Sequence, residues 1–375
     1  MAGIYIHIPF CRQKCYYCDF YKTLNTSLTK EFLSALKNEI QQNANYLEKE
    51  PVETIYFGGG TPSVLTKNEL YEILMVLNNE FQILPDAEIT FEANPDDLSI
   101  QYLENIYSVG INRLSIGIQS FQNKYLKKMN RRHSVKQAVE SVENAAKIGF
   151  ENISVDLIYG LPELTIDDWK ASLKQVFQLP VHHLSAYHLT YHEGTVFYNL
   201  PKNGTLKELK EPDSILQFNT LVEATKKMGF QQYEISNFAK NRMYSKHNKF
   251  YWFGNKYLGL GPSAHSFNGT SRRWIISNTE NYIESINNNL SCFEMEILSE
   301  NDKYNEYILT RIRTIGGVST NFIESNFGQE KLSYFLKNIS RYQSSDLVIQ
   351  NNNIFTLTNK GLFVSDEIMA DLIFI

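Results

Sequence analysis

The chain has 375 residues, a length that predicts two or three domains, or one large barrel with an appendage. Hydrophobic residues make up 43% of it and aromatic residues 13%, enough for a packed core, so a disordered or low-complexity protein is excluded. Its 36 basic and 41 acidic side chains give a net charge of −5, which argues against a nucleic-acid-binding protein held by phosphate neutralisation.

The N-terminal stretch has no basic region ahead of an apolar run, so we expect no secretory signal. No window reaches the roughly 18 apolar residues of a membrane span. We therefore expect a soluble protein in the cytoplasm. In that reducing compartment its four cysteines are expected to be ligands or core residues rather than disulfides.

Apolar, β-branched segments alternate with segments of helical period. In the first predicted helix, Phe32, Leu36 and Ile40 recur every four residues. Capping boxes, Thr66 with Glu69 and Thr165 with Asp168, mark two further helix starts. The predicted strands are Gly3–Ile8, Glu53–Phe57, Glu88–Glu92, Arg113–Ile118, Ile153–Ile158 and His183–Leu189. This α/β alternation predicts a partial (β/α)6, TIM-like barrel with a parallel sheet.

We expect the barrel to span residues 1–235 and a connecting segment to span 236–293. A small helical, winged-helix-like domain should follow over 294–375, with a helix at Tyr304–Ile315 and a hairpin joining Leu347–Ile349 to Ile354–Thr358. This last part has no concentrated Lys/Arg face. A structural or partner-docking role is therefore favoured over DNA binding.

Cys11, Cys15 and Cys18 form a C-x-x-x-C-x-x-C motif directly after the first predicted strand. Three thiolates at this spacing can hold three corners of a [4Fe–4S] cluster and leave the fourth iron open to a small molecule. A structural zinc would need a fourth ligand, and a c-type haem attachment would need His at the position of Asp19. A redox dithiol would use two cysteines. The motif thus predicts an open-cornered cluster, with Cys292 as a buried free thiol.

Glycine or polar residues stand where several predicted strands end: Gly58 to Thr61, Glu92, Gln119 and Asp156. Each alone is as consistent with a tight turn or a loop cap. In a barrel, however, the carboxyl ends of the strands are where ligands bind. Glycines let the backbone approach an anionic group, and carboxylates suit an ammonium or a ribose. The shared placement predicts a cofactor pocket.

The cysteine motif at the head of an incomplete parallel barrel resembles the radical S-adenosylmethionine (SAM) superfamily. In that superfamily the open iron chelates SAM, and electron transfer from the cluster cleaves it to a 5′-deoxyadenosyl radical. The GGGTP, FEANP and VDLIYGLP segments and Asn130-Arg131 are similar to the family of anaerobic coproporphyrinogen III oxidases and related haem chaperones. This resemblance implies a SAM site formed by Tyr5, Gly59, Gly60, Thr61, Glu92, Gln119, Arg131, Asp156 and Thr190.

Two features depart from the oxidases. Phe20 stands where they carry a further cysteine, and the cluster motif already begins at Cys11, without their N-terminal extension. These departures favour a chaperone over an oxidase that decarboxylates propionate side chains. They also argue against the second SAM of the oxidases, which Tyr17 would otherwise contact. A non-catalytic iron–sulfur scaffold is the third alternative, which the strand-end residues disfavour.

Residues 231–267 are dense in Tyr, Phe, Trp and His, and His247 to Tyr251 form an H-N-x-x-Y motif. From residue types alone, such a histidine is more often a core residue than a haem ligand. The motif is similar to that of the haem chaperones, so the resemblance implies that His247 and Tyr251 contact haem. The resemblance also implies that acceptor haemoproteins, including respiratory ones, are partners. It further implies that two copies of the chain can form a homodimer.

Overall fold

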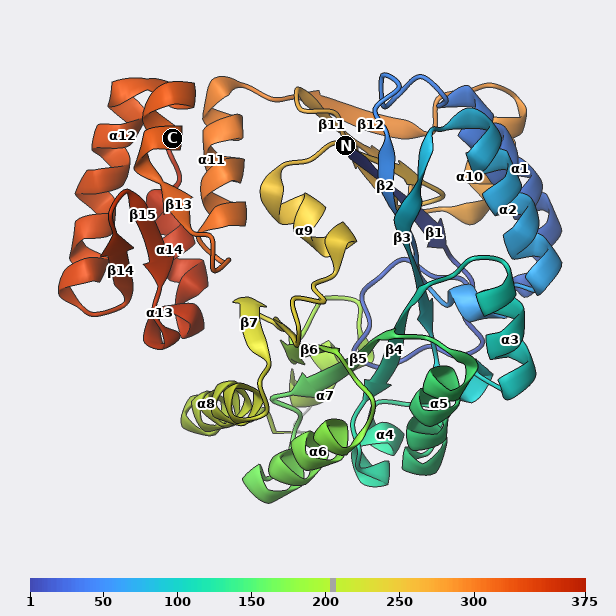
Figure 1. Ribbon diagram of the computed structural model, residues 1–375, viewed down its shortest axis with the longest axis horizontal. Helices are drawn as coiled ribbons and strands as arrows, with labels where there is room; N and C mark the ends of the chain where they lie inside the picture. The colour runs from blue at the N-terminus through green and yellow to red at the C-terminus, as the bar shows by residue number, and fades with distance from the viewer. Residues whose placement is uncertain (203–206) are drawn as a thin grey trace.

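The computed structural model describes residues 1–202 and 207–375 (Figure 1). Six parallel strands form the centre of its main sheet, each paired with the next along the chain. They are β1 (Ala2–Ile8), β2 (Val52–Gly59), β3 (Ile83–Ala93), β4 (Arg113–Gln119), β5 (Asn152–Tyr159) and β6 (His183–His188). All six predicted strands are confirmed; the largest difference is that β3 begins at Ile83 rather than Glu88.

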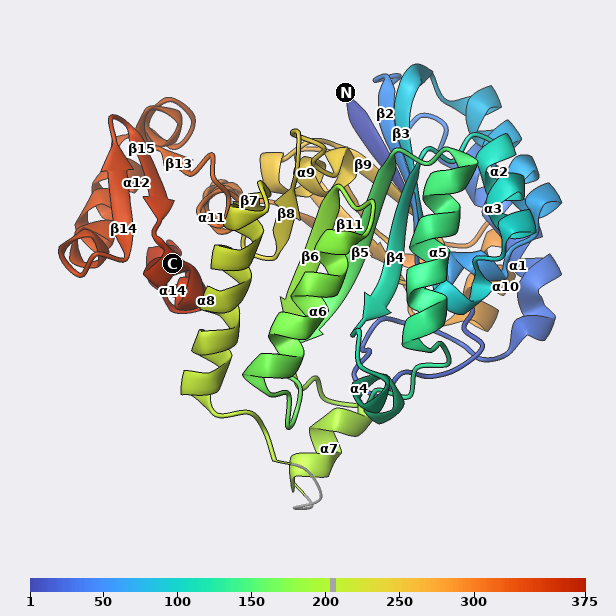
Figure 2. The ribbon, with the colours of Figure 1, turned by 60° about the horizontal axis from the view of Figure 1, so that its bottom comes forward.

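Helices cover the outer face of this curled sheet, as Figure 2 shows for those beside β4, β5 and β6. The longer ones are α1 (Thr29–Gln42), α2 (Lys67–Glu80), α3 (Ile100–Ser108), α5 (Val135–Ile148), α6 (Ile166–Gln178) and α8 (Glu211–Lys227). Short helices α4 (Asn123–Lys128) and α7 (Val196–Lys202) and 3-10 turns η1 (Thr26–Leu28), η2 (Pro62–Val64) and η3 (Pro95–Asp97) lie in the connections. The predicted face of α1, with Phe32, Leu36 and Ile40, is fully buried.

The capping box predicted at Thr66 is confirmed, because its side chain and that of Glu69 each bind the other's backbone N–H. At Thr165 only half of the box forms. The Thr165 hydroxyl accepts from the N–H of Asp168, but the Asp168 carboxylate receives hydrogen bonds from Lys124 and Tyr125 instead of the Thr165 N–H.

The main sheet continues past both edges of the six-stranded centre. On the β1 side, β9 (Tyr257–Leu260) pairs in parallel, and β10 (His265–Phe267), β11 (Ser271–Ile275) and β12 (Phe293–Ile297) follow antiparallel. On the β6 side lie β8 (Asn237–Ala239) and β7 (Gln231–Glu234). Segment 236–293 supplies four of these strands, β8 to β11, together with α9 (Lys246–Phe253) and α10 (Thr279–Asn287), and β12 begins at its last residue.

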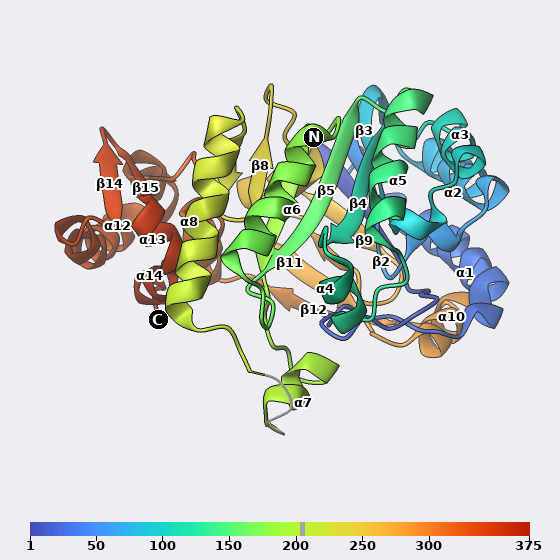
Figure 3. The same cartoon turned by 90° about the horizontal axis from the view of Figure 1, so that it is seen from below.

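The C-terminal part has its own core, built around Tyr304, Phe335 and Phe355, and lies beside α8 (Figure 3). It contains α11 (Glu300–Arg311), β13 (Val318–Ser319), α12 (Thr320–Ser344), β14 (Val348–Asn351), β15 (Ile354–Leu357), α13 (Asn359–Phe363) and α14 (Ser365–Leu372). The expected hairpin is the β14–β15 pair. The fold class, a partial barrel with a helical C-terminal domain, is confirmed, while the domain boundaries stay a prediction.

Among the helices described, none is both long enough and apolar enough to cross a lipid bilayer.

Candidate functional site

A cavity of about 440 Å³ opens at the carboxyl ends of the parallel strands. It brings together most of the residues predicted for the cluster and SAM sites. These are Cys11, Cys15, Cys18, Gly59, Gly60, Thr61, Glu92, Gln119, Arg131, Asp156 and Thr190. Three predicted residues are not part of its lining: Tyr5, His247 and Tyr251.

The cysteine loop between β1 and η1 is fixed at both of its ends and in the middle. The Cys11 N–H donates to the Thr23 carbonyl over 2.9 Å, and the Tyr16 N–H donates to the Met129 carbonyl over 3.1 Å. Gln13 Nε2 donates to Asn130 Oδ1 at 2.8 Å. These bonds hold the loop over the cavity, against the segment that follows α4.

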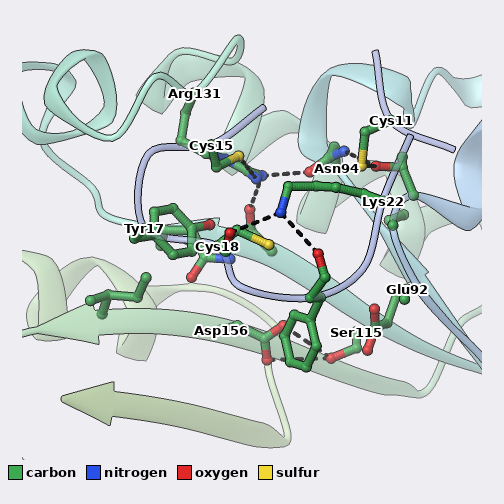
Figure 4. A pocket seen from close by; sticks show the side chains of 18 of the residues that line it. Cys11, Cys15, Tyr17, Cys18, Lys22, Glu92, Asn94, Ser115, Arg131 and Asp156 are labelled. Carbon is green, nitrogen blue, oxygen red and sulfur yellow. Dashed lines mark hydrogen bonds between the residues drawn. The ribbon is translucent and has the colours of Figure 1, made fainter. Parts of the chain in front are cut away.

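The three thiols face one cavity in different settings (Figure 4). Cys11 is buried, with its Sγ 3.3 Å from Thr61 Oγ1, whereas Cys15 Sγ lies 3.4 Å from Arg131 Nη1. Burial raises the pKa of the Cys11 and Cys18 thiols, and Lys22 opposes this at Cys18. In the described part of the chain, no three His, Cys, Asp or Glu side chains converge closely enough to hold a metal ion. Three cysteines on one anchored loop nevertheless match the donor set of an iron–sulfur cluster.

The glycines after β2 are needed for packing as well as for any ligand. A Cβ at Gly60 would lie 2.8 Å from the carbonyl oxygens of Ile8 and Phe10, closer than real contacts allow. Gly59 has a φ of 102°, and a Cβ there would meet the His7 ring at 2.7 Å. The GGGTP segment thus lets β2 approach β1 and the start of the cysteine loop.

Glu92 and Asp156 put two carboxyl groups against the cavity from β3 and β5. Tyr56 donates a hydrogen bond to Glu92 Oε1 at 2.6 Å, and Ser115 Oγ donates to Asp156 at 3.3 Å. Burial raises the pKa of Glu92 to about 7 and that of Asp156 to about 6. A cationic ligand would stabilise the ionised forms of these buried carboxyl groups, so the pair favours a ligand with a positive charge. The donor set therefore fits the ammonium and ribose of SAM.

Arginines complete the cavity. Arg113, 1% exposed, reaches the cavity from β4, and its Nε finds no hydrogen-bond partner among the residues that the structure describes. Arg131 Nη2 donates to Asn94 Oδ1 and to the Gly117 carbonyl, both at 2.6 Å. Gln119 nearby has a φ of 67°, a strained value for a non-glycine residue and one that is enriched at functional sites.

The predicted haem residues lie behind the cavity wall. The His247 side chain is 1% exposed; its Nδ1 is 2.8 Å from Thr54 Oγ1 and its Nε2 is 2.9 Å from the Tyr251 hydroxyl. Burial lowers the pKa of His247 to about 3, so the ring is neutral. Tyr5 is likewise behind the wall, stacked on Tyr56 with ring centres 6.0 Å apart. In this arrangement neither imidazole nitrogen is free to ligate iron.

The sequence analysis missed several residues that line the cavity: Tyr56, Asn94, Arg113, Ser115 and Asn248. Asn94 follows Glu92 by two residues in FEANP and could have been found from the strand-end argument. Arg113 stands at the start of its strand, which gave no such signal.

Comparisons with known proteins agree with this architecture. Residues 5–176 match the family model of the radical SAM superfamily, and residues 298–364 match that of the HemN C-terminal domain.

Several curated proteins named heme chaperone HemW are similar over almost their whole length. The protein from Bacillus subtilis is 33% identical over 99% of this chain and 98% of its own. The one from Lactococcus lactis is 32% identical, covering 97% and 95%, and the one from Mycobacterium tuberculosis is 31% identical, covering 99% and 94%.

Among solved structures, coproporphyrinogen III oxidase (HemN) from Escherichia coli, a radical SAM enzyme, superposes with a TM-score of 0.87. The match covers 99% of this chain and 90% of that one at 24% sequence identity. At this identity the likeness shows the radical SAM fold.

Proposed function

Because the chain belongs to the HemW family within the radical SAM superfamily, we propose that it is a haem chaperone. In this proposal it carries a [4Fe–4S] cluster and SAM, binds haem, and delivers it to acceptor haemoproteins in the cytoplasm. The single observation that supports this best is the cavity that joins three cysteines of one loop with the carboxyl groups of Glu92 and Asp156.

Cys11, Cys15 and Cys18 would hold the cluster, which when bound would supply the electron for SAM cleavage. To do so their side chains would have to turn toward one another at the cavity face, while backbone hydrogen bonds keep the loop anchored. Lys22 opposes the rise that burial causes in the pKa of the Cys18 thiol, and Arg131 Nη1 lies 3.4 Å from Cys15 Sγ.

SAM would occupy the cavity beside the cluster. Glu92 would accept from its ammonium group and Asp156 from its ribose, while Gln119 and Thr190 supply neutral polar groups at the same strand ends. Gly59, Gly60 and Thr61 would border the cofactor, with Arg131 fixing the wall through Asn94. Tyr5, which lies behind Tyr56, would act by positioning that ring rather than by direct contact.

Haem would be bound through α9, with His247 and Tyr251 as its contacts. For His247 Nε2 to reach iron, the Tyr251 hydroxyl has to give up its 2.9 Å hydrogen bond, and α9 has to expose the ring. The proposal therefore includes an opening of α9 when haem binds.

An oxygen-independent coproporphyrinogen III oxidase is the alternative. Tyr17, which would contact a second SAM in such an oxidase, is among the residues that line the cavity. Against this alternative, Phe20, which lines the cavity and is 66% exposed, stands at the position where the oxidases carry a cysteine.

The two functions are separated by two assays on anaerobically reconstituted protein. In the first, the haem-loaded chain is mixed with an apo-haemoprotein, and the absorption spectrum of the acceptor reports transfer. In the second, the chain is incubated with coproporphyrinogen III, SAM and a reductant. The chaperone transfers haem and forms no protoporphyrinogen; protoporphyrinogen formation without haem transfer would establish the alternative.

A further inference from the structure

Helix α9 is held in its place by contacts from three strands of the barrel. Glu88 on β3 accepts hydrogen bonds from the backbone N–H groups of Lys246 and His247, each at 3.1 Å. A carboxylate in this position also offsets the positive end of the helix dipole. On β2, Thr54 binds His247 Nδ1. On β1, a Cβ at Gly3 would lie within 3.3 Å of His247 Cε1, so no gap separates them.

His247 also couples α9 to the cavity wall. Its ring stacks on that of Tyr56, with centres 5.0 Å apart and planes inclined by 29°. Tyr56 in turn lines the cavity and donates to Glu92. In the observed arrangement the histidine is a positioning residue, which orients the rest of α9.

The next residue, Asn248, is the part of the H-N-x-x-Y motif that reaches the cavity. It lines the same cavity as Tyr56, Glu92 and Arg113, and it is the only residue of α9 among the described residues that does so. Its backbone N–H binds the Ser245 hydroxyl, but its carboxamide has no hydrogen-bond partner within the described chain. A carboxamide can both donate and accept, so it suits a ligand that carries both kinds of group.

We infer that Asn248 contacts the ligand of the cavity, so that SAM, when bound, holds α9 in its place and opposes the exposure of His247. This inference rests on the proposed function, because it takes SAM as the occupant of the cavity. It assigns the motif two tasks: His247 and Tyr251 fix the helix, and Asn248 senses the occupant.

A coupling between the two cofactors follows. If haem ligation requires α9 to open, and SAM stabilises the closed helix through Asn248, then SAM weakens haem binding. By thermodynamic reciprocity, haem weakens SAM binding by the same factor. The factor is limited by the free energy of the Asn248 contact, since a ligand shifts an equilibrium only by its differential affinity for the two states.

The test uses cluster-reconstituted, full-length protein and the variant Asn248→Ala. Alanine is the best helix former, and the carboxamide makes no internal bond, so the variant is expected to fold normally. Lys249→Ala is the matched control on the same helix. Its ammonium group lies over the Tyr244 and Phe253 rings, and the residue is not part of the cavity lining.

Equilibrium dialysis measures SAM affinity, and hydrogen exchange measures the opening of α9. We expect Asn248→Ala to weaken SAM binding about tenfold, as the loss of a hydrogen bond to a ligand does, and Lys249→Ala to leave it unchanged. SAM should slow exchange of the α9 amides in the wild type and in Lys249→Ala, but much less in Asn248→Ala. Equal SAM affinity in all three proteins, or α9 protection that does not depend on Asn248, would overturn the inference.

A haem titration with and without SAM separates this inference from the proposed function. Haem binding that SAM does not weaken would leave the chaperone standing and remove the coupling. Loss of all haem binding, with the Asn248 effect on SAM intact, would remove the chaperone and keep Asn248 as a ligand contact. A wild type that does not bind SAM would overturn both the inference and the SAM site.

Discussion

The phenol of Tyr56 donates a hydrogen bond of 2.6 Å to the carboxyl group of Glu92. Tyr56 thereby connects the cavity with the residues behind its wall, because its hydroxyl binds Glu92 and its ring stacks on the ring of His247. A change in the charge of Glu92 therefore acts on the wall that supports α9. The residues proposed for SAM and those proposed for haem share this one tyrosine.

The cluster proposal predicts which cysteines matter. Cys15→Ser or Cys18→Ser should reduce the iron content of anaerobically reconstituted protein to background, because a cluster with only two protein ligands is not retained. Cys292→Ser should keep the full iron content, since that thiol is buried away from the cavity. Iron and sulfide analysis measures this. Full iron in Cys15→Ser would refute the proposed ligand set.

Glu92→Gln should separate stability from cofactor binding. The pKa of Glu92 is raised by burial to about 7 from 4.5, so its contribution to stability is present below pH 4.5 and is lost as the pH rises through 7. At pH 8 the variant without cofactors should be more stable than the wild type, by an amount on the order of 2 kcal/mol. At pH 4.5 the difference should vanish. Chemical denaturation at the two pH values measures it.

The same substitution should weaken SAM binding, because the amide cannot offset the charge of the ammonium group. In the wild type, SAM affinity should rise with pH through about 7 as Glu92 ionises, and Glu92→Gln should remove this dependence. Glu39→Gln is the control. Burial raises the pKa of Glu39 to about 7 as well, but it lies away from the cavity and binds Tyr282 and the Gly261 N–H. Glu39→Gln should be more stable than the wild type at pH 8 and should bind SAM with unchanged affinity. An equal loss of SAM affinity in Glu39→Gln would contradict the assignment of this effect to Glu92.

Arg131→Met should destabilise the protein and impair cluster assembly. The guanidinium group makes two hydrogen bonds of 2.6 Å that tie Asn94 to the Gly117 carbonyl, and a third contact to Cys15. Losing charged hydrogen bonds of this kind costs on the order of 2 kcal/mol or more. Thermal unfolding and the iron content after reconstitution report the two effects. Arg132→Met removes a neighbouring positive charge, which pairs with Asp96 and Asp97, and should keep the iron content. Equal iron in both variants would count against a role of Arg131 at the cluster.

The barrel could be predicted from the sequence because its signals are local. Five of the six central strands contain β-branched residues in a short, mainly apolar run, and α2 opens with a capping box that needs only Thr66 and Glu69. That the strand-end residues line one cavity was also predictable, since parallel strands bring their carboxyl ends to one edge, while their role as ligands stays a prediction. The strands β9 to β12 were missed because they are short and their pairing partners lie far away in sequence; β9, for example, pairs with β1.

The positions of His247 and Tyr5 could not be derived in this way. The local sequence pattern of a histidine among aromatic residues is the same whether its side chain lines a cavity or lies behind it. The position of His247 is fixed by its contact with Thr54, which is 193 residues away in sequence, and no local sequence pattern predicts such a contact. Asn248 was overlooked for the same reason, since one residue along a short helix separates the buried side from the cavity side.

An anaerobic haem titration of the cluster-reconstituted protein, followed by visible absorption, tests the chaperone most directly. The variants are His247→Ala, which removes the proposed ligand, and Tyr251→Phe, which removes only the hydroxyl bound to Nε2. Circular dichroism and the iron content after reconstitution verify that each variant is folded. We predict saturation near one haem per chain, at least tenfold weaker binding in His247→Ala, and binding as tight or up to about fivefold tighter in Tyr251→Phe, since one hydrogen bond no longer competes for the nitrogen. A wild type that shows no saturable haem binding would contradict the chaperone function, and undiminished binding in His247→Ala would contradict His247 as the ligand.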